Sequence, residues 1–362
     1  MSTTPTVSST MRAARMYGYN QPLVLEEVPT PDIGPDEVLI KVGAAGMCRT
    51  DVQLVDGYFD KYAPSQFPVI PGHEIAGEIV RVGSAAEAGG HREGDQVVVV
   101  GGMGDGTCRH CHRGDTQICS HGAWPGFGPY GGYAEYVPVP AAYVIKVDRQ
   151  YGLNAEQLAP LTDAGLTPYR GLKKLRDAGA LAAGRVVGVM GVGALGTYAV
   201  QYAKLLGAGA TVVAFARNQD KLDLAKKLGA DHAINIGGRS LDEVRAELNA
   251  ATGQSEIDAG IDCAGAEEMI RLGFGLLATA GHYSSVGLVG DRIDIPLFPL
   301  VAREYTYHGS FWGNYNDLSE VVALAQQGKV QHTIHEIAFD DVNDAIDRIR
   351  TGEIVGRAVI KY

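Results

Sequence analysis

Short apolar runs separated by glycine, proline and aspartate characterise the chain from about Met11 to about Val147. Runs of this length between turn-forming residues are typical of β-strands. The pattern therefore predicts an all-β unit, either a barrel or a folded sheet. Its strands are expected at Glu37–Val42, Ala76–Val82, Gln96–Val100, Tyr133–Val139 and Tyr143–Val147.

From about Leu166 to Gly290 the pattern changes to alternating apolar runs and stretches with helical spacing. Helices are expected at Leu195–Leu206 and near Asp220–Leu228. Strand-helix alternation indicates βαβ units and a parallel sheet, so the predicted fold class is α/β with a doubly wound sheet. The expected strands are Arg185–Met190, Thr211–Ala216, His232–Ile236, Ile257–Cys263 and His282–Leu288.

The last part of the sequence returns to mixed structure. Helices are expected near Leu318–Gln327 and Val342–Arg350, followed by a strand at Gly356–Tyr362. The simplest architecture inserts the nucleotide-type domain into a β-rich domain built from both flanking segments. We therefore expect residues 1–165 and 306–362 to form one domain, with residues 1–10 as a disordered tail, and residues 166–305 to form the other.

A glycine-rich hexapeptide, GVGALG, links the strand expected at Arg185–Met190 to the following helix. Gly191 permits a tight turn, Gly193 lets the backbone approach a pyrophosphate, and Gly196 permits close helix–strand packing. In this context the pattern predicts a dinucleotide site, although a glycine-rich turn without a ligand is the alternative. The residues assigned to the site are Gly191, Val192, Gly193, Ala194, Leu195 and Gly196.

The end of the next strand bears on the choice of cofactor. An acidic residue there accepts from the ribose 2′-hydroxyl of NAD, but this chain has Ala216 followed by Arg217. A missing carboxylate removes repulsion of a 2′-phosphate, and a guanidinium offers that phosphate a bidentate partner. NADP is therefore favoured and NAD is the alternative, in which Arg217 stacks over adenine or faces solvent.

Composition narrows the class of protein. The apolar fraction of 46% is ordinary for a globular chain, and the net charge of −11 argues against nucleic acid and anionic membranes as partners. No apolar run approaches the ~20 residues that span a bilayer. The first ten residues lack the features of a secretory signal, so we expect a cytoplasmic protein. Three of the five cysteines lie within twelve positions, which indicates metal rather than disulfides.

Two groups of residues are candidates for metal sites. Cys48 and His73 are ligand types that zinc prefers, although each could equally be an ordinary core residue. The second group has regular spacing, and Asp105 stands where a fourth cysteine would complete the series. His110 and His112 are competing ligands there, and a reduced, metal-free cluster is the alternative. The predicted set is Asp105, Cys108, Cys111 and Cys119.

From about Met11 to Tyr362 these features resemble the medium-chain zinc-dependent alcohol dehydrogenase family. Cys48 stands in a Cys-x-Thr-Asp motif and His73 in Gly-His-Glu, which supply two catalytic zinc ligands in that family. The third family ligand is usually a cysteine before Gly-x-Thr-x-Tyr, where this chain has Asp163. That segment is similar to bacterial secondary-alcohol dehydrogenases, which use aspartate here. The resemblance implies a GroES-like domain, a Rossmann domain and two zinc ions per chain, and it supports Asp105.

The resemblance also implies a mechanism, in which hydride passes between an alcohol and NAD(P) while zinc acts as a Lewis acid. Thr50 is expected to take the first step of a proton relay, although its hydroxyl could instead bond to backbone. Asp51 is expected to accept from His73, and Glu74 to sit behind the metal. Without the resemblance, Arg49 and Arg357 would be solvated charges. The expected cofactor contacts are Arg49 and Arg357 at the pyrophosphate, and Thr167, Val286, Gly287 and Leu288 at the nicotinamide.

The substrate is the least determined part. The resemblance implies that Tyr58 or Phe59, together with Phe311 and Trp312, lines the substrate pocket. Trp312 could equally be a core residue. Aromatic walls favour an apolar, secondary alcohol or ketone, aryl or cyclic. A polyol or sugar dehydrogenase of the same fold and a non-catalytic nucleotide-binding sensor are the competing hypotheses. The family implies a homotetramer or homodimer formed through the edge of the Rossmann sheet.

Overall fold

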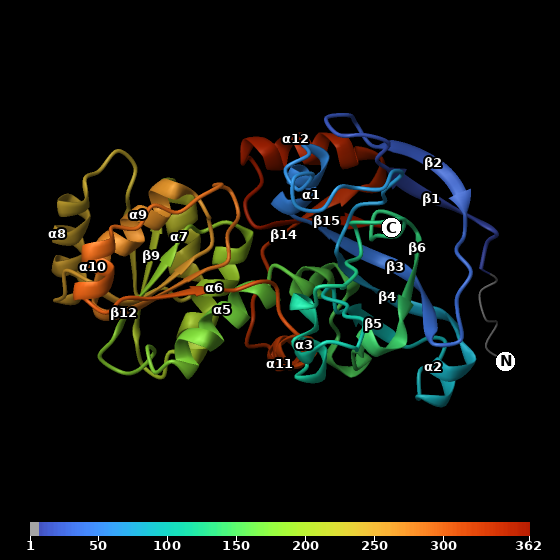
Figure 1. Ribbon diagram of the computed structural model, residues 1–362, viewed down its shortest axis with the longest axis horizontal. Helices are drawn as coiled ribbons and strands as arrows, with labels where there is room; N and C mark the ends of the chain where they lie inside the picture. The colour runs from blue at the N-terminus through green and yellow to red at the C-terminus, as the bar shows by residue number, and fades with distance from the viewer. Residues whose placement is uncertain (1–6) are drawn as a thin grey trace. The chain divides into compact units, whose positions relative to one another are not determined.

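The computed structural model describes residues 7–362 and divides into two compact units (Figure 1). The first combines the chain up to Asp163 with Gly313–Tyr362, and the second is Ala164–Trp312. The second unit extends beyond the predicted boundary at 305, because the next segment pairs with its sheet. Residues 1–6 of the expected tail lie outside the described residues, and the first strand begins at Thr10.

A sheet of seven strands forms the framework of the first unit. Its order is β14-β15-β3-β4-β5-β7, and β6 also pairs with β3. Neighbours are antiparallel except β14 and β15, which are parallel. The strands are β3 (Glu37–Met47), β4 (Glu74–Val82), β5 (Gln96–Val99), β6 (Tyr136–Pro140), β7 (Val144–Lys146), β14 (Ile334–Ala338) and β15 (Arg357–Lys361).

Two distant parts of the sequence share this sheet. Ala358–Lys361 of β15 pairs with residues 44–47 of β3, and Figure 1 shows red and blue ribbons side by side there. Ala358, Val359 and Ile360 are all buried, so β15 contributes to the core and does not merely cover an edge. The sheet therefore brings residues just after β3 close to residues at the start of β15.

Shorter elements surround the sheet. β1 and β2 form a separate antiparallel pair. Apolar side chains from this pair, the sheet and the helix before β15 make up one core cluster. The elements are β1 (Thr10–Arg15), β2 (Val24–Pro29), α1 (Arg49–Val55), α2 (Ser84–Ala88), α3 (Arg109–His112), α4 (Ala155–Leu158), α11 (Tyr315–Gln326), α12 (Val342–Thr351) and the 3₁₀ turns η1 (Thr116–Ile118), η2 (Ala141–Tyr143), η3 (Arg149–Tyr151), η4 (Ala159–Thr162) and η5 (Phe339–Asp341).

The second unit is built on a parallel sheet of six strands in the order β10-β9-β8-β11-β12-β13. β8 is buried along its whole length, as expected where helices cover both faces of a parallel sheet. The strands are β8 (Val186–Met190), β9 (Thr211–Ala216), β10 (His232–Asn235), β11 (Ile257–Asp262), β12 (Leu277–Ser285) and β13 (Thr306–Gly309).

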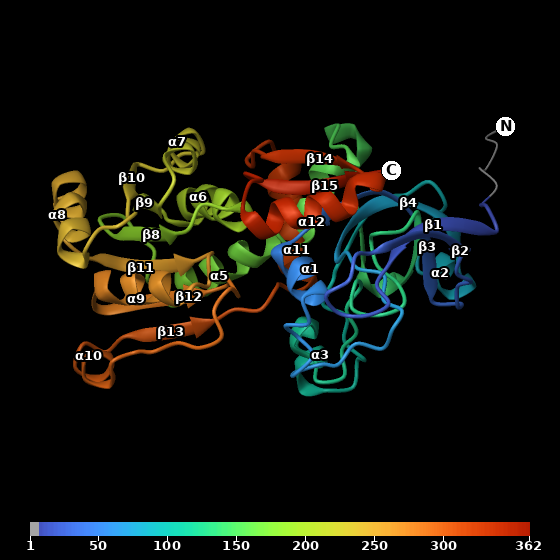
Figure 2. The same ribbon diagram turned by 90° about the horizontal axis from the view of Figure 1, so that it is seen from above.

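Helices alternate with these strands, so the predicted α/β fold class is confirmed (Figure 2). α5 packs on α6 and α6 on α7, whereas α8 packs on α9. The strand order reverses between β8 and β11, which is where such sheets bind ligands at the carboxyl ends of their strands. The helices are α5 (Leu166–Asp177), α6 (Ala194–Leu206), α7 (Gln219–Lys227), α8 (Leu241–Thr252), α9 (Glu267–Leu276) and α10 (Leu297–Ala302).

Within residues 7–362, no helix has the length and apolar composition needed to cross a membrane.

Candidate active site and metal centres

Three segments of the first unit bring the predicted catalytic ligands together. Cys48 caps α1 directly after β3, His73 precedes β4, and Asp163 follows η4. Asp163 Oδ2 lies 3.4 Å from Cys48 Sγ and 3.6 Å from His73 Nε2. Ligand atoms of these three residues and of Glu74 lie within 4.8 Å of one another, and all four residues are buried. The structure thus unites residues separated by more than 100 positions.

Asp51 holds this group in place. Its Oδ2 accepts a 2.7 Å hydrogen bond from the Cys48 backbone N–H, and its Oδ1 accepts from Gly72 N–H at 3.2 Å. The same Oδ1 lies 3.3 Å from His73 Nδ1, which leaves Nε2 facing Asp163. A carboxylate at one imidazole nitrogen fixes the ring orientation of a metal-binding histidine. Asp51 therefore has the position expected from the sequence.

Glu74 and Arg357 form a buried ion pair beside the cluster. Arg357 is 3% exposed, and its guanidinium lies 2.9 Å from Glu74 Oε1 and 3.3 Å from Asp163 Oδ2. It also donates to the Met47 carbonyl at 3.0 Å. Glu74 lies so close to β3 that a Cβ at Gly46 would come within 1.7 Å of Oε2. Glu74 thus lies beside the candidate ligands, and Arg357 pairs with Glu74 and Asp163, while its contact with a pyrophosphate stays a prediction.

The electrostatics of the cluster fit a cation. Burial disfavours a charged imidazole, yet the carboxylates of Asp51 and Asp163 raise the pKa of His73 well above its usual value. Burial, with Asp163 and Cys48 nearby, also raises the pKa of Glu74, and Arg357 only partly offsets this. Acidic groups therefore outnumber the one buried guanidinium. A thiolate, an imidazole and a carboxylate are zinc ligands, so the donor set fits zinc.

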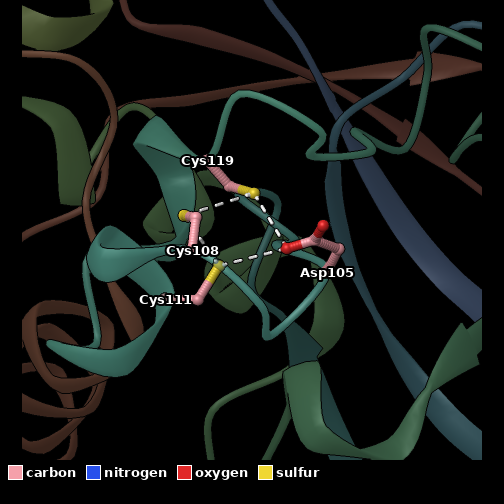
Figure 3. A group of neighbouring side chains, drawn as sticks. All are labelled: Asp105, Cys108, Cys111 and Cys119. Atoms are coloured by element: carbon pink, nitrogen blue, oxygen red, sulfur yellow. Dashed lines mark hydrogen bonds between the residues drawn. The ribbon is translucent and has the colours of Figure 1, made fainter.

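The second predicted metal group is also assembled (Figure 3). Cys108 lies at the start of α3 and Cys119 at the end of η1. Cys108 Sγ lies 3.6 Å from Cys111 Sγ and 3.8 Å from Cys119 Sγ, while Asp105 Oδ1 lies 3.8 Å and 3.4 Å from those two sulfurs. In Figure 3 the three sulfurs and this oxygen point toward one another. Four converging ligands suit a closed tetrahedral zinc site.

Asp105 completes this group in preference to the competing histidines. Backbone and hydroxyl donors of Thr107 lower the pKa of Asp105, so its carboxylate stays ionised. His110 instead lies against the guanidinium groups of Arg109 and Arg113. Among the described residues, the clustered ligand atoms include neither His110 nor His112.

The glycine-rich hexapeptide occupies the predicted strand–turn–helix position in the second unit. Gly191 follows β8 with φ +89°, and α6 begins at Ala194. A Cβ at Gly196 would lie 2.0 Å from the Gly191 carbonyl oxygen, so only glycine permits this helix–strand contact. A Cβ at Gly193 would meet nothing within 4 Å, which leaves its backbone accessible to a ligand. Val192 and Leu195 lie in the same turn.

Other cofactor candidates occupy informative positions. Ala216 ends β9 as a buried residue, and Arg217 after it is exposed. Thr167 is buried in the first turn of α5. Arg49 donates at 3.2 and 2.9 Å to the carbonyls of Ile349 and Arg350 at the end of α12. Val286, Gly287 and Leu288 follow β12, rather than belonging to it as predicted.

Aromatic rings gather beside His73 in the first unit. The Phe127 ring centroid lies 6.1 Å from that of His73, and Phe59 and Trp124 each meet Phe127 edge-on at 5.6 Å. Phe59 was predicted, and Tyr58 packs on it at 5.0 Å. Phe127 and Trp124 were not predicted, because no motif in their segment links them to His73, which lies about fifty positions earlier.

Phe311 and Trp312 belong to the second unit. They pack edge-on to each other at 6.1 Å, with Phe311 39% exposed and Trp312 buried.

Comparison with known proteins identifies the class. Residues 34–149 match the alcohol dehydrogenase GroES-like domain, and residues 194–327 match the zinc-binding dehydrogenase domain. A NAD-dependent alcohol dehydrogenase of Saccharolobus solfataricus is 36% identical over 97% of this chain and 99% of its own. The chain belongs to the medium-chain zinc-dependent alcohol dehydrogenase family, and it is an oxidoreductase of the alcohol dehydrogenase and ketone reductase type.

Two further similarities bear on specificity. A D-arabinose 1-dehydrogenase (NADP(+)) of Saccharolobus solfataricus is 34% identical over 96% of this chain and 97% of its own. The structure of an acetophenone reductase from Geotrichum candidum, in complex with NAD, matches with a TM-score of 0.87. It is 29% identical, with 99% of this chain and 98% of that chain covered.

Proposed function

We propose that this enzyme interconverts a secondary alcohol, aryl or cyclic, and its ketone with NADP(H), using zinc held by Cys48, His73 and Asp163. The observation that carries the proposal is the buried meeting of these three ligands beside the Phe127 ring. In the oxidative direction, the alcohol and NADP⁺ are converted into the ketone, NADPH and one proton.

The metal and its ligands have separate tasks. Cys48, His73 and Asp163 would hold a zinc ion, which would supply Lewis-acid polarisation of the substrate oxygen. Asp51 orients His73, and Arg357 offsets the acidic charge of Glu74 and Asp163. Asp105, Cys108, Cys111 and Cys119 would hold a second zinc ion with a structural role, because four donor groups of the chain converge there.

Thr50 takes the first step of the proton path. Its Oγ1 lies 3.5 Å from Sγ of Cys48, one of the proposed zinc ligands. A hydroxyl both donates and accepts, so Thr50 passes on the proton that the alcohol releases.

The aromatic rings beside His73 support an apolar substrate. Phe59, Phe127 and Trp124 offer ring edges and faces that favour contact with another ring.

The 2′-phosphate of NADP is proposed to pair with Arg217, which follows a strand that ends without a carboxylate. An Ala216→Asp variant is expected to shift the ratio of kcat/KM values toward NAD by at least about tenfold, because the new carboxylate repels the phosphate. Initial rates with both cofactors measure the ratio. An unchanged ratio contradicts the assignment.

A sugar or polyol dehydrogenase is the second candidate, favoured by the similarity to the D-arabinose 1-dehydrogenase. The aromatic surroundings of His73 weigh against it, because a sugar presents many hydroxyls that need polar partners. D-Arabinose and 1-phenylethanol are the probes that separate the two.

We also propose that two copies associate through the second unit, giving a homodimer or, through pairs of dimers, a homotetramer. β13 is the edge strand of its sheet, and the segment before it carries exposed apolar side chains. These are Leu288, Val289, Ile293, Leu297, Phe298 and Val301. The clustered thiols support a reducing, cytoplasmic location.

One experiment tests the central proposal. Zinc is measured per chain, and initial rates are then recorded with 1-phenylethanol, cyclohexanol and D-arabinose. Two zinc ions and NADP-linked oxidation of the first two alcohols are expected. One zinc ion without turnover of any alcohol overturns the proposal, whereas turnover of D-arabinose alone selects the second candidate.

A further inference from the structure

Asp262 is a buried carboxylate that neither the metal centres nor the glycine-rich turn uses. It is the last residue of β11, between β8 and β12, and it is fully buried. Its position is thus the carboxyl end of a central strand next to the reversal of strand order, where parallel sheets bind their ligands.

The Asp262 carboxylate shapes the loop that follows it. Oδ1 accepts from the backbone N–H of Ala264 at 3.1 Å, and both oxygens accept from Gly265 N–H at 3.0 Å. Hydrogen bonds to a charged acceptor are stronger than those between neutral groups. The side chain therefore fixes the path of residues 263–265.

The backbone of the same residue fixes a second loop. The Asp262 carbonyl accepts from Val286 N–H at 3.0 Å and from Gly287 N–H at 3.1 Å. These residues leave β12 at the same edge of the sheet. A single residue thus joins loop 263–265 to loop 286–287.

The two loops then press against each other without room for side chains. A Cβ on Gly265, which has φ +68°, would lie 2.2 Å from the carbonyl carbon of Gly287. Gly290 N–H donates to the Gly265 carbonyl at 2.6 Å. Loop 263–265 also meets the glycine-rich turn, because a Cβ on Gly191 would lie 3.0 Å from Ala264 Cβ. The position of loop 286–287 therefore depends on how Asp262 holds residues 263–265.

Burial raises the pKa of Asp262 to about 6, although the Gly265 and Ala264 N–H groups oppose the shift. The carboxylate is therefore mostly ionised at neutral pH, and its charge strengthens the hydrogen bonds that it accepts from the two N–H groups. A buried charge costs free energy in the absence of such partners. Here the two N–H groups are those partners, so the buried charge and the path of the loop depend on each other.

We propose that Asp262 is a positioning residue that holds loop 286–287 in place for the nicotinamide half of the cofactor. This inference rests on the proposed function and on the sequence-based expectation that Val286–Leu288 contacts the nicotinamide. The adenosine half binds at the glycine-rich turn and at Arg217, whereas the hydrogen bonds that the Asp262 carboxylate and carbonyl accept come from residues 264, 265, 286 and 287. Loss of the carboxylate therefore weakens one half of the site selectively.

The test compares two ligands that differ only in the nicotinamide ring. Dissociation constants of NADP⁺ and of 2′-phospho-ADP-ribose are measured by calorimetry for wild type and Asp262→Asn. The asparagine amide turns an NH₂ group toward a backbone N–H, so one hydrogen bond is lost. We expect NADP⁺ to bind about tenfold more weakly, with 2′-phospho-ADP-ribose and zinc content unchanged.

Asp258→Asn is the matched control. Asp258 lies at the other end of β11, where its Oδ2 accepts from Val186 N–H at 2.8 Å and Oδ1 pairs with Arg185 at 3.1 Å. The Asp258→Asn substitution removes the same charge from the same strand, and we expect this variant to bind both ligands with wild-type affinity. Gly290→Ala is a second test variant with Asp262 intact. Its Cβ would lie 3.0 Å from the Gly265 carbonyl oxygen, so it should show the same selective loss.

Two results overturn the inference. Equal weakening of both ligands in Asp262→Asn and Gly290→Ala assigns Asp262 a general structural role, and unchanged NADP⁺ affinity removes any role in positioning. If wild type binds NAD⁺ in place of NADP⁺, the same comparison uses NAD⁺ and ADP-ribose. A wild-type protein that binds neither dinucleotide overturns the proposed function itself.

Discussion

Asp163 brings a carboxylate oxygen to the candidate catalytic centre, and this single side chain contacts both Cys48 and His73. Asp105 has the corresponding place among the thiols of the second group. The two aspartates therefore make similar contacts with sulfur and differ in their burial and in the chemistry of their neighbours.

Asp163→Ala is expected to reduce kcat/KM by more than about a hundredfold while zinc per chain falls from two ions to one, because the catalytic metal loses a ligand. The far-ultraviolet circular dichroism should be unchanged. Asp105→Ala is the matched control, for which we expect retained turnover and a lower melting temperature. Full activity in Asp163→Ala contradicts its assignment as a ligand.

His332 makes stability depend on pH. Burial lowers its pKa to about 4, whereas an unfolded histidine has a pKa near 6.5. The stability that the neutral form contributes is present above pH 6.5 and is lost as the pH falls toward 4, by at most about 3 kcal/mol. His332→Gln should flatten this part of a plot of unfolding free energy against pH. His112→Gln, an exposed control, should leave the plot unchanged, and an equal slope in both variants rules out His332 as the cause.

At the scale of residues, the sequence predicted which candidate metal-binding side chains come together better than it predicted the residues that surround them. Cys48 and His73 stood in motifs, and the structure assembles them with Asp163. Arg357 and Phe127 had no such local signal, since their partners lie hundreds or tens of positions away and meet only through the β3–β15 pairing and the turn before β6. Spacing along the chain cannot reveal contacts that depend on strand register.

At the scale of elements, α8 shows how residues at the two ends of a helix set where the helix begins and ends. Ser240 accepts from Glu243 N–H while Glu243 accepts from Ser240 N–H, and the helix ends at Gly253 with φ +79°. Both ends were readable as a capping box and a C-terminal glycine, yet the helix was not among those predicted, because apolar periodicity was the criterion.

Ser240→Ala is expected to destabilise the protein by about 1 kcal/mol, because the Glu243 N–H in the first turn loses its acceptor, the Ser240 hydroxyl. Urea unfolding followed by circular dichroism measures the change. Ser319→Ala is the control, since its hydroxyl donates to the Tyr315 carbonyl inside α11 and contributes little to that helix. A loss of equal size in both variants refutes the capping argument.

Strands were predicted within a few residues where apolar runs were continuous, as in β8 and β9. β12 is the exception, with a predicted range of His282–Leu288 and an observed range of Leu277–Ser285. The strand ends at Ser285, and the next two N–H groups, of Val286 and Gly287, both donate to one carbonyl, that of Asp262 at the end of β11, so the ladder does not continue. An apolar run in the sequence therefore does not distinguish a strand from a loop whose backbone N–H groups donate to a buried carbonyl.

At the scale of the whole molecule, the exposed apolar segment near β13 bears on assembly. Leu297, Phe298 and Val301 of α10 are 72%, 82% and 67% exposed. Patches of this kind mark association sites, because apolar surface is stabilised by removal from water.

Phe298→Asp is therefore expected to shift the protein from an oligomer to monomers at micromolar concentration, since the charge would be buried in the interface. Sedimentation velocity reads the change. Tyr62→Asp is the control, because Tyr62 is 64% exposed in the first unit and lies outside the proposed interface. A wild-type monomer, or a variant that sediments like the wild-type oligomer, contradicts this mode of assembly.

The two-part plan of the molecule was predicted from the change of pattern near Leu166, but its second boundary was not. β13 is only four residues long, and a strand of that length gives no periodic signal to distinguish it from the mixed region after it. Its pairing with β12 is a property of the sheet and not of its own sequence.

The antiparallel pairing of β15 with β3 has a consequence for biosynthesis. On the ribosome, residues 164–312 emerge as one continuous stretch, so the second unit has all its strands before the first unit does. Because translation proceeds at about 5–20 residues per second, Cys48, His73 and Asp163 are synthesised several seconds or more before Arg357. During that interval the carboxylates of Glu74 and Asp163 lack the guanidinium with which they pair in the folded chain, so this ion pair is among the last contacts of the first unit to form.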